Sequence, residues 1–192
     1  SRLGYMDLQK FGIKLFLTTN DSFNSKDFIP VFHNWIQDKI IDDHLLIDVA
    51  DYSHIQNGPG VMLVAHEGNF SLDQENQQQG IMYMRKTEIA GSFKERFNSV
   101  LLTVIKAANR LSDNDVSKPV DVKPNLFRFI ANDRLYAENT VDNQDLYKKK
   151  IQKVLDGKYP GRLFEFGDVS DENERLAFTV NFSNDIDILD EQ

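Results

Sequence analysis

The chain has 192 residues, a formal net charge of −8 and a pI of about 5.0, with 41% hydrophobic residues. This length suits one sizeable domain, and fourteen phenylalanines supply apolar area for an ordered core. An acidic surface repels phosphate backbones, so we expect no nucleic-acid partner. The lack of cysteine excludes disulfides and thiolate chemistry. No apolar run reaches the ~20 residues that span a bilayer, so we expect no membrane partner and a soluble, cytoplasmic protein.

The first half of the chain combines short apolar runs with one helical stripe. Runs at 13–18, 45–52, 61–67 and 81–86 are rich in β-forming residues and predict strands, whereas the polar stretch at 71–79 predicts a loop. Asp27 suits the N-cap of a helix. The apolar stripe of that helix consists of Phe28, Phe32, Trp35, Ile36 and Ile40.

The strongest helix signal begins at Ser92. Ser92 and Glu95 fit a capping box, in which each side chain satisfies a backbone N–H of the first turn. One face of the predicted helix is apolar, and its members are Phe93, Phe97, Val100, Leu101, Val104, Ile105, Ala108 and Leu111. We expect this helix to pack on a sheet.

After a polar connection the early pattern returns. Segments at 126–134, 145–155, 162–169 and 176–182 predict strand, helix, strand and strand, the same order as in the first half. Two interpretations stay open: an internal β-α-β-β duplication with halves at 11–112 and 125–184, or one domain over 1–192 in which a common order occurs twice. Either way the pattern predicts an α+β fold, with helices packed on one face of a mixed, mostly antiparallel sheet. The first two strands, joined through a helix, are expected to be parallel.

Several segments carry a resemblance. The stretches FIPVFHNWIQ, LLIDVADYSHIQNGPGVMLVAHEGNFSLD, GIMYMRK and NDRL resemble a family of uncharacterised bacterial proteins with the pattern IDVADYxHxxxGPGVxLxxHE. The similarity covers most of the chain and is most specific at 45–73. It implies a bacterial origin and a self-contained soluble domain, and it implies no catalytic residue.

A hairpin around Gly58-Pro59-Gly60 holds the main candidates for metal chemistry. If its strands pair antiparallel, Leu45, Ile47 and Val49 share the core face with Val61, Leu63 and Ala65. The other face then places Asp48 diagonally beside His66, an arrangement that orients an imidazole for metal binding but also forms ordinary surface ion pairs. His54, His66 and Asp48 are the candidate ligands of a zinc, manganese or iron ion. The turn itself precedes a strand and lacks the phosphate-loop pattern, so we interpret it as architecture.

A second set of candidates suits a polar ligand. Asp51 and His54 lie in the first hairpin loop, Arg85 ends a strand, and Asn132, Asp133 and Arg134 end another. If the strand ends meet, Arg85 and Arg134 could hold a carboxylate or phosphate; the alternative is that Asn132 and Asp133 only form a turn.

Three functional hypotheses follow. The chief one is a non-enzymatic binding module for a small polar ligand or a protein partner, with loops 51–60, 68–79 and 132–140 as its working surface. The alternative is a metal-assisted enzyme that uses His54 and His66 with nearby carboxylates. The third is assembly into a homo-oligomer through an exposed sheet edge or an apolar helix face.

Overall fold

The computed structural model describes residues 8–18, 23–113, 120–133, 137–183 and 185–190. In this part of the chain eight strands form one sheet in the order β2-β3-β4-β5-β1-β6-β8-β7, and every pairing between neighbours is antiparallel. The strands are β1 (Phe11–Thr18), β2 (Leu46–Tyr52), β3 (Gly60–Ala65), β4 (Gly68–Asp73), β5 (Gly80–Arg85), β6 (Asp121–Ala131), β7 (Phe164–Gly167) and β8 (Ala177–Phe182). The α-helices are α1 (Ile29–Asp38), α2 (Phe93–Ser112) and α3 (Val141–Lys158).

The α+β prediction is confirmed, with a refinement of the strand directions. Four successive antiparallel pairings lead from β1 through β5, β4 and β3 to β2, so β1 and β2 do run in the same direction. They are separated by three strands, however, and are not hydrogen-bonded to each other. The predicted duplication stays a prediction, although the two first strands of the proposed halves, β1 and β6, are antiparallel neighbours at the centre of the sheet.

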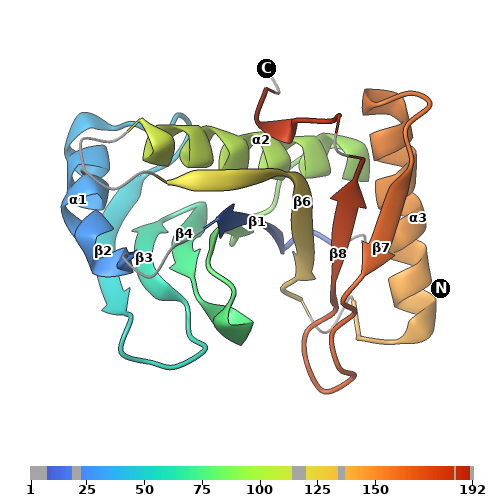
Figure 1. Cartoon of the computed structure of the whole chain (residues 1–192), viewed down its shortest axis with the longest axis horizontal. Helices are drawn as coiled ribbons and strands as arrows, with labels where there is room; N and C mark the ends of the chain where they lie inside the picture. The colour runs from blue at the N-terminus through green and yellow to red at the C-terminus, as the bar shows by residue number, and fades with distance from the viewer. Residues whose placement is uncertain (1–7, 19–22, 114–119, 134–136, 184, 191–192) are drawn as a thin grey trace.

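All three α-helices contribute buried side chains to one core cluster on a single face of the sheet. Figure 1 shows α2 running across the strands, with α1 at one end of the sheet and α3 at the other. The core beneath them is aromatic: the ring of Phe11 lies 5.4 Å from that of Phe129, which lies 5.4 Å from that of Phe178. Packing of this kind buries much area per residue and fixes the helices on the sheet.

The helix ends follow their side-chain caps. Ser92 accepts a hydrogen bond from the backbone N–H of Glu95 at 3.2 Å, so the predicted start of α2 is confirmed. The helix predicted at 145–155 is longer, because Thr140 caps α3 by accepting from the N–H of Asn143. Asp27 is not the N-cap of α1: it lies in a 3-10 turn, η2 (Ser25–Phe28), which Asn24 caps.

The segment 68–73, expected to belong to a loop, forms strand β4. Its pattern alternates buried Phe70 and Leu72 with the polar residues Asn69 and Ser71, as a strand in the middle of a sheet requires. The glycine, asparagine and serine in this segment lower its β-propensity, and cross-strand pairing with β3 and β5 overrides that preference. Of the predicted working loop, only the part after Asp73 connects strands.

The hairpin of β2 and β3 departs from the predicted pattern at one residue. Val61, Leu63 and Ala65 are buried as expected, but Leu45 and Ile47 are 64% and 55% exposed. A bulge between Leu46 and Asp48 shifts the register, so Leu46 packs against the core in place of Leu45 and Ile47, while Val49 does so as predicted. An extra residue in one strand inverts the alternation on that side of the bulge.

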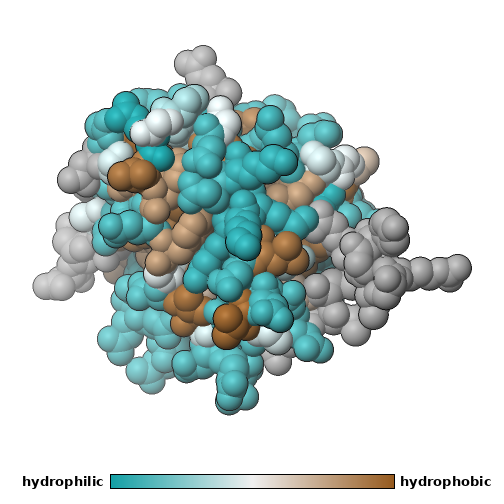
Figure 2. Space-filling model, turned by 90° about the vertical axis from the view of Figure 1, so that its right-hand side faces the viewer, coloured by the Kyte–Doolittle hydropathy of each residue, from teal (hydrophilic) through white to brown (hydrophobic). Residues whose placement is uncertain are grey.

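No helix in the described part of the chain is long and apolar enough to cross a membrane. Figure 2 views the molecule from the α3 and β7 side and shows a largely hydrophilic surface with small, separate hydrophobic patches. The exposed large apolar residues at this end are Val141, Leu146, Leu163 and Val169.

Candidate functional site

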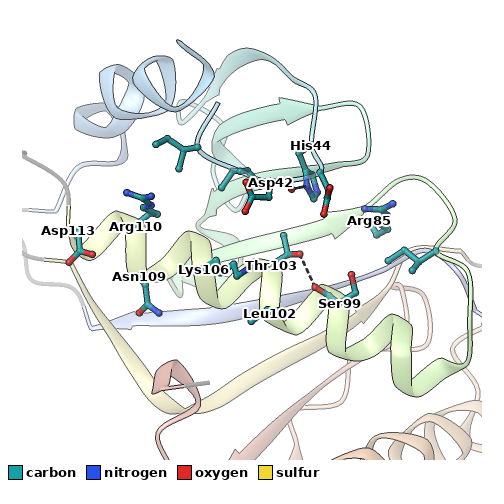
Figure 3. Close-up of a pocket in the computed structure, with 14 residues that line it drawn as sticks. Asp42, His44, Arg85, Ser99, Leu102, Thr103, Lys106, Asn109, Arg110 and Asp113 are labelled. Atoms are coloured by element: carbon teal, nitrogen blue, oxygen red, sulfur yellow. Dashed lines mark hydrogen bonds between the residues drawn. The ribbon is translucent and has the colours of Figure 1, made fainter. Parts of the chain in front are cut away.

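A cavity of about 590 Å³ lies between α2 and the segment that joins α1 to β2 (Figure 3). It is larger than each of three cavities described on the opposite face of the sheet. Its walls are Ile40, Ile41, Asp42, Asp43, His44, Arg85, Ile89, Ser99, Leu102, Thr103, Lys106, Asn109, Arg110 and Asp113. A volume of this size suits a small molecule.

One wall is a stripe of α2 that faces away from the sheet. Lining residues recur along the helix from Ser99 through Thr103 and Lys106 to Arg110 and Asp113, at steps of three or four residues. Such steps place side chains on one helix face. Because the apolar stripe of α2 is already fixed on β1 and β5, the polar stripe is held open toward the cavity.

The other wall carries His44, whose ring is held by two hydrogen bonds. Its Nδ1 lies 2.9 Å from the carbonyl oxygen of Asp42, and its Nε2 lies 2.6 Å from the hydroxyl oxygen of Tyr83. A carbonyl oxygen can only accept, so Nδ1 carries the proton; in a neutral imidazole, Nε2 then accepts from the hydroxyl. The orientation of His44 is therefore fixed from both sides.

Arg85 shares the hydroxyl of Tyr83. Its Nη1 donates to that oxygen at 3.2 Å, and its Nε donates to the carbonyl of Thr87 at 3.0 Å. Burial raises the pKa of Tyr83, and the nearby Arg85 partly opposes that rise. These two hydrogen bonds fix the orientation of the guanidinium group. The remaining N–H donors of Arg85 are therefore preorganised to bind an anionic group.

Glu67, in the turn between β3 and β4, and Gly68, the first residue of β4, support this network. A Glu67 carboxylate oxygen accepts from the backbone N–H of Leu45 at 2.8 Å and so anchors the chain just after His44. Gly68 pairs with Arg85, and a Cβ atom at Gly68 would lie 2.7 Å from the Tyr83 hydroxyl. Only glycine leaves room there for the tyrosine ring to reach His44.

The charges of the cavity are mixed. Arg85, Lys106 and Arg110 supply positive charge, and three carboxylates, those of Asp42, Asp43 and Asp113, supply negative charge. Figure 3 shows Arg85 and Arg110 toward opposite ends of the cavity, with Lys106 between them on α2. Alternating signs in one concave site suit a small ligand with both hydrogen-bonding and charged groups, and they disfavour a polyanion.

The predicted metal ligands do not meet. His54 follows β2 and His66 follows β3, so the two lie at opposite ends of the hairpin, separated by six paired positions or roughly 20 Å. One ion needs ligands within about 2 Å of it, so the shared site proposed for His54 and His66 is wrong. Asp48 is opposite Val64, hence diagonal to His66 as predicted, but its carboxylate accepts from the N–H of Val49. The described residues contain no group of three or more His, Asp or Glu side chains that could hold a metal ion.

The predicted ligand-binding residues fall into separate places. Arg85 lines the α2 cavity, whereas Asn132 lines a cavity on the opposite face of the sheet. Asp133 lies two residues after the end of β6, and Arg134 lies outside the described residues. Asp51 accepts from the hydroxyl and N–H of Ser53, which lowers the pKa of its carboxyl.

Sequence analysis did not select Tyr83, His44 or the polar stripe of α2 as parts of a site. One local signal was available, because Tyr83 and Arg85 are two apart on a strand and therefore share a face. The contacts with His44 and Glu67 join segments that are distant in the chain, and only the strand order brings them together.

No protein-family model matches the chain, and no curated protein matches its sequence. The resemblance to a bacterial family therefore stays a prediction that rests on the segments that carry it.

Proposed function

We propose that this protein is a binding module for a small polar molecule that carries an anionic group, and that the cavity between α2 and the 40–44 segment is its site. The observation that carries this proposal is the orientation of Arg85 by Tyr83 and Thr87 at the wall of a cavity of about 590 Å³. We infer that Arg85 holds the anionic group, while Asp42 and Lys106 hold the remaining polar groups of the ligand. A cytoplasmic location goes with this proposal.

A small ligand is favoured over a protein partner because the polar groups line a concave cavity rather than a flat patch. Self-association through the β2 edge has less support. The bulge at Ile47 and the bond from the Val49 N–H to the Asp48 carboxylate both interrupt the edge that a second strand would need.

Thermal melting with a panel of acetate, succinate, glutamate, lysine and putrescine tests the proposal. A ligand present at about a hundred times its dissociation constant should raise the melting temperature by roughly 5–10 °C. We expect at least one carboxylate to do so and putrescine, which has no anionic group, not to.

The same panel with Arg85→Gln identifies the site. We expect this variant to lose the shift, Arg85→Lys to keep part of it, and the surface variant Lys149→Gln to keep all of it, because Lys149 is exposed on α3. A carboxylate shift that persists unchanged in Arg85→Gln would place the ligand elsewhere and refute the assignment.

A further inference from the structure

The helix-free face of the sheet carries a second cavity, of about 440 Å³, whose floor combines three methionines with Asn69 and Ser71 of β4. Met62, Met82 and Met84 line it, and they are three of only four methionines in the sequence. Met82 and Met84 are each 8% exposed and pack with Ile130 and Ala177 in a cluster separate from the main core. Methionine side chains are flexible and polarisable, so a floor of this kind adapts to apolar ligands of differing shape.

One end of this cavity is basic. The register places Lys86 after β5 level with Lys10 before β1, and Lys10 accepts through its carbonyl from the N–H of Asn132 after β6. Arg175, just before β8, continues the row and donates from Nη1 to the Asn132 side-chain oxygen at 2.9 Å. Lys86, Asn132 and Arg175 all line the cavity, so a row of two basic side chains, with an amide bonded to one of them, borders one end of it.

The other end is closed by a buried ion pair. Lys14 Nζ lies 2.6 Å from an Asp73 carboxylate oxygen, and both residues are 3% exposed. The lysine stem reaches Asp73 by crossing β5 at Gly80, where a Cβ atom would lie 2.6 Å from the lysine Cε. The second carboxylate of the lining, Glu75, lies near Arg128 and offsets its charge. Each acid of the lining, Asp73 and Glu75, thus has a basic neighbour on the same face. Lys86 and Arg175 at the other end add positive charge to the lining.

We propose that this cavity binds a small amphipathic anion, with the carboxylate or phosphate group at Lys86 and Arg175 and the apolar part on the methionine floor. The charge complementarity and the floor specify both halves of the ligand. The Gly58-Pro59 turn, which also lines the cavity, then serves as a wall of this site. The inference concerns a different face and different residues from the α2 cavity, so each proposal can fail alone.

Methyl-labelled methionine gives a direct test, since the protein contains four methionines and three of them line the cavity. We would titrate octanoate into the full chain and follow the methyl signals by NMR, assigned through single Met→Leu variants. The expected result is saturable movement of the Met62, Met82 and Met84 signals, with a dissociation constant on the order of 1 mM or tighter for a ligand of this size. Octylammonium, with the same chain and the opposite charge, should not move them.

Two variants assign the anionic group. Arg175→Gln and Lys86→Gln should each weaken octanoate binding by about tenfold, as the loss of one charge-assisted hydrogen bond predicts, while Lys149→Gln should leave it unchanged. Octyl phosphate in place of octanoate distinguishes a preference for phosphate from one for carboxylate. Absent methyl shifts, equal shifts with octylammonium, or unchanged affinity in both variants would each overturn the proposal.

Discussion

The two faces of the sheet are stabilised by different kinds of side chain. The helix-covered face packs phenylalanines from β1, β6, β8 and α2 against one another, with ring centroids 5.4–6.4 Å apart. The helix-free face holds methionines, a buried Lys14–Asp73 pair and a row of basic residues, with cavities between them. Close packing stabilises a fold, whereas incompletely filled apolar and polar surface is a feature of ligand sites. Close packing on the helix-covered face therefore supplies most of the stability, and the α2 cavity lies at the rim of that face, whereas the helix-free face holds the second proposed site.

The two faces should differ most in how much unfolding free energy the protein loses when one side chain on each face is truncated. Phe97 is fully buried among Phe11, Phe93 and Phe127. Its change to alanine should lower the free energy of unfolding by about 4 kcal/mol. Met84→Ala should lose no more than about 2 kcal/mol, because Met84 already borders a cavity. Urea unfolding of both variants measures this, and equal losses would show that the two faces are packed alike.

The buried ion pair tests what the helix-free face contributes by itself. Asp73→Leu leaves the Lys14 ammonium buried without its carboxylate and should cost about 3 kcal/mol of unfolding free energy. The double variant Lys14→Met, Asp73→Leu should recover most of that loss, because it removes both charges. Urea unfolding of the single and double variants gives the coupling.

The Arg162–Asp185 pair is the matched control, since both side chains are about half exposed. Arg162→Gln should change the free energy of unfolding much less than Asp73→Leu does. A double variant as unstable as Asp73→Leu would mean that the pair itself, and not the burial of an unpaired charge, determines stability on this face.

Sequence reasoning was accurate where local signals and the final structure agree. The capping box at Ser92 and the apolar stripe of α2 predicted that helix to within a residue, and the α+β class followed from the order of elements. Sequence analysis failed where the pairing of strands determines the local structure. β4 was predicted as a loop because its alternation is short and polar, and the bulge at Ile47 inverted the faces of Leu45 and Ile47.

The candidate sites show the same limit. Arg85 and Asn132 were both selected from the sequence, but the pleat directs them to opposite faces and into different cavities. His44, Tyr83 and Glu67 come from three segments that meet only through the strand order β2-β3-β4-β5. No spacing along the chain encodes a contact of that kind, so a single sequence cannot reveal it.

The smallest predicted effect is on the pH dependence of the free energy of unfolding, and it comes from Tyr83, a buried residue of the helix-covered face. Burial raises the pKa of Tyr83 above its ordinary value near 10, so above that pH the unfolded chain loses the proton while the folded chain keeps it. The unfolded state then binds fewer protons than the folded state, and the free energy of unfolding falls as pH rises. Tyr83 therefore contributes its full stability below about pH 10 and loses it as the pH rises toward its folded-state pKa.

The variant Tyr83→Phe should differ from the wild type in one way at pH 8 and in another at higher pH. At pH 8 it should be less stable than the wild type by about 1 kcal/mol, because Arg85 and His44 lose a hydrogen-bond partner. Between pH 9.5 and 11 its urea midpoint should fall less steeply than that of the wild type, because the raised ionisation has been removed. Parallel curves for the two proteins would show that the Tyr83 hydroxyl ionises as readily in the folded protein as in the unfolded chain, and would contradict a raised pKa for Tyr83.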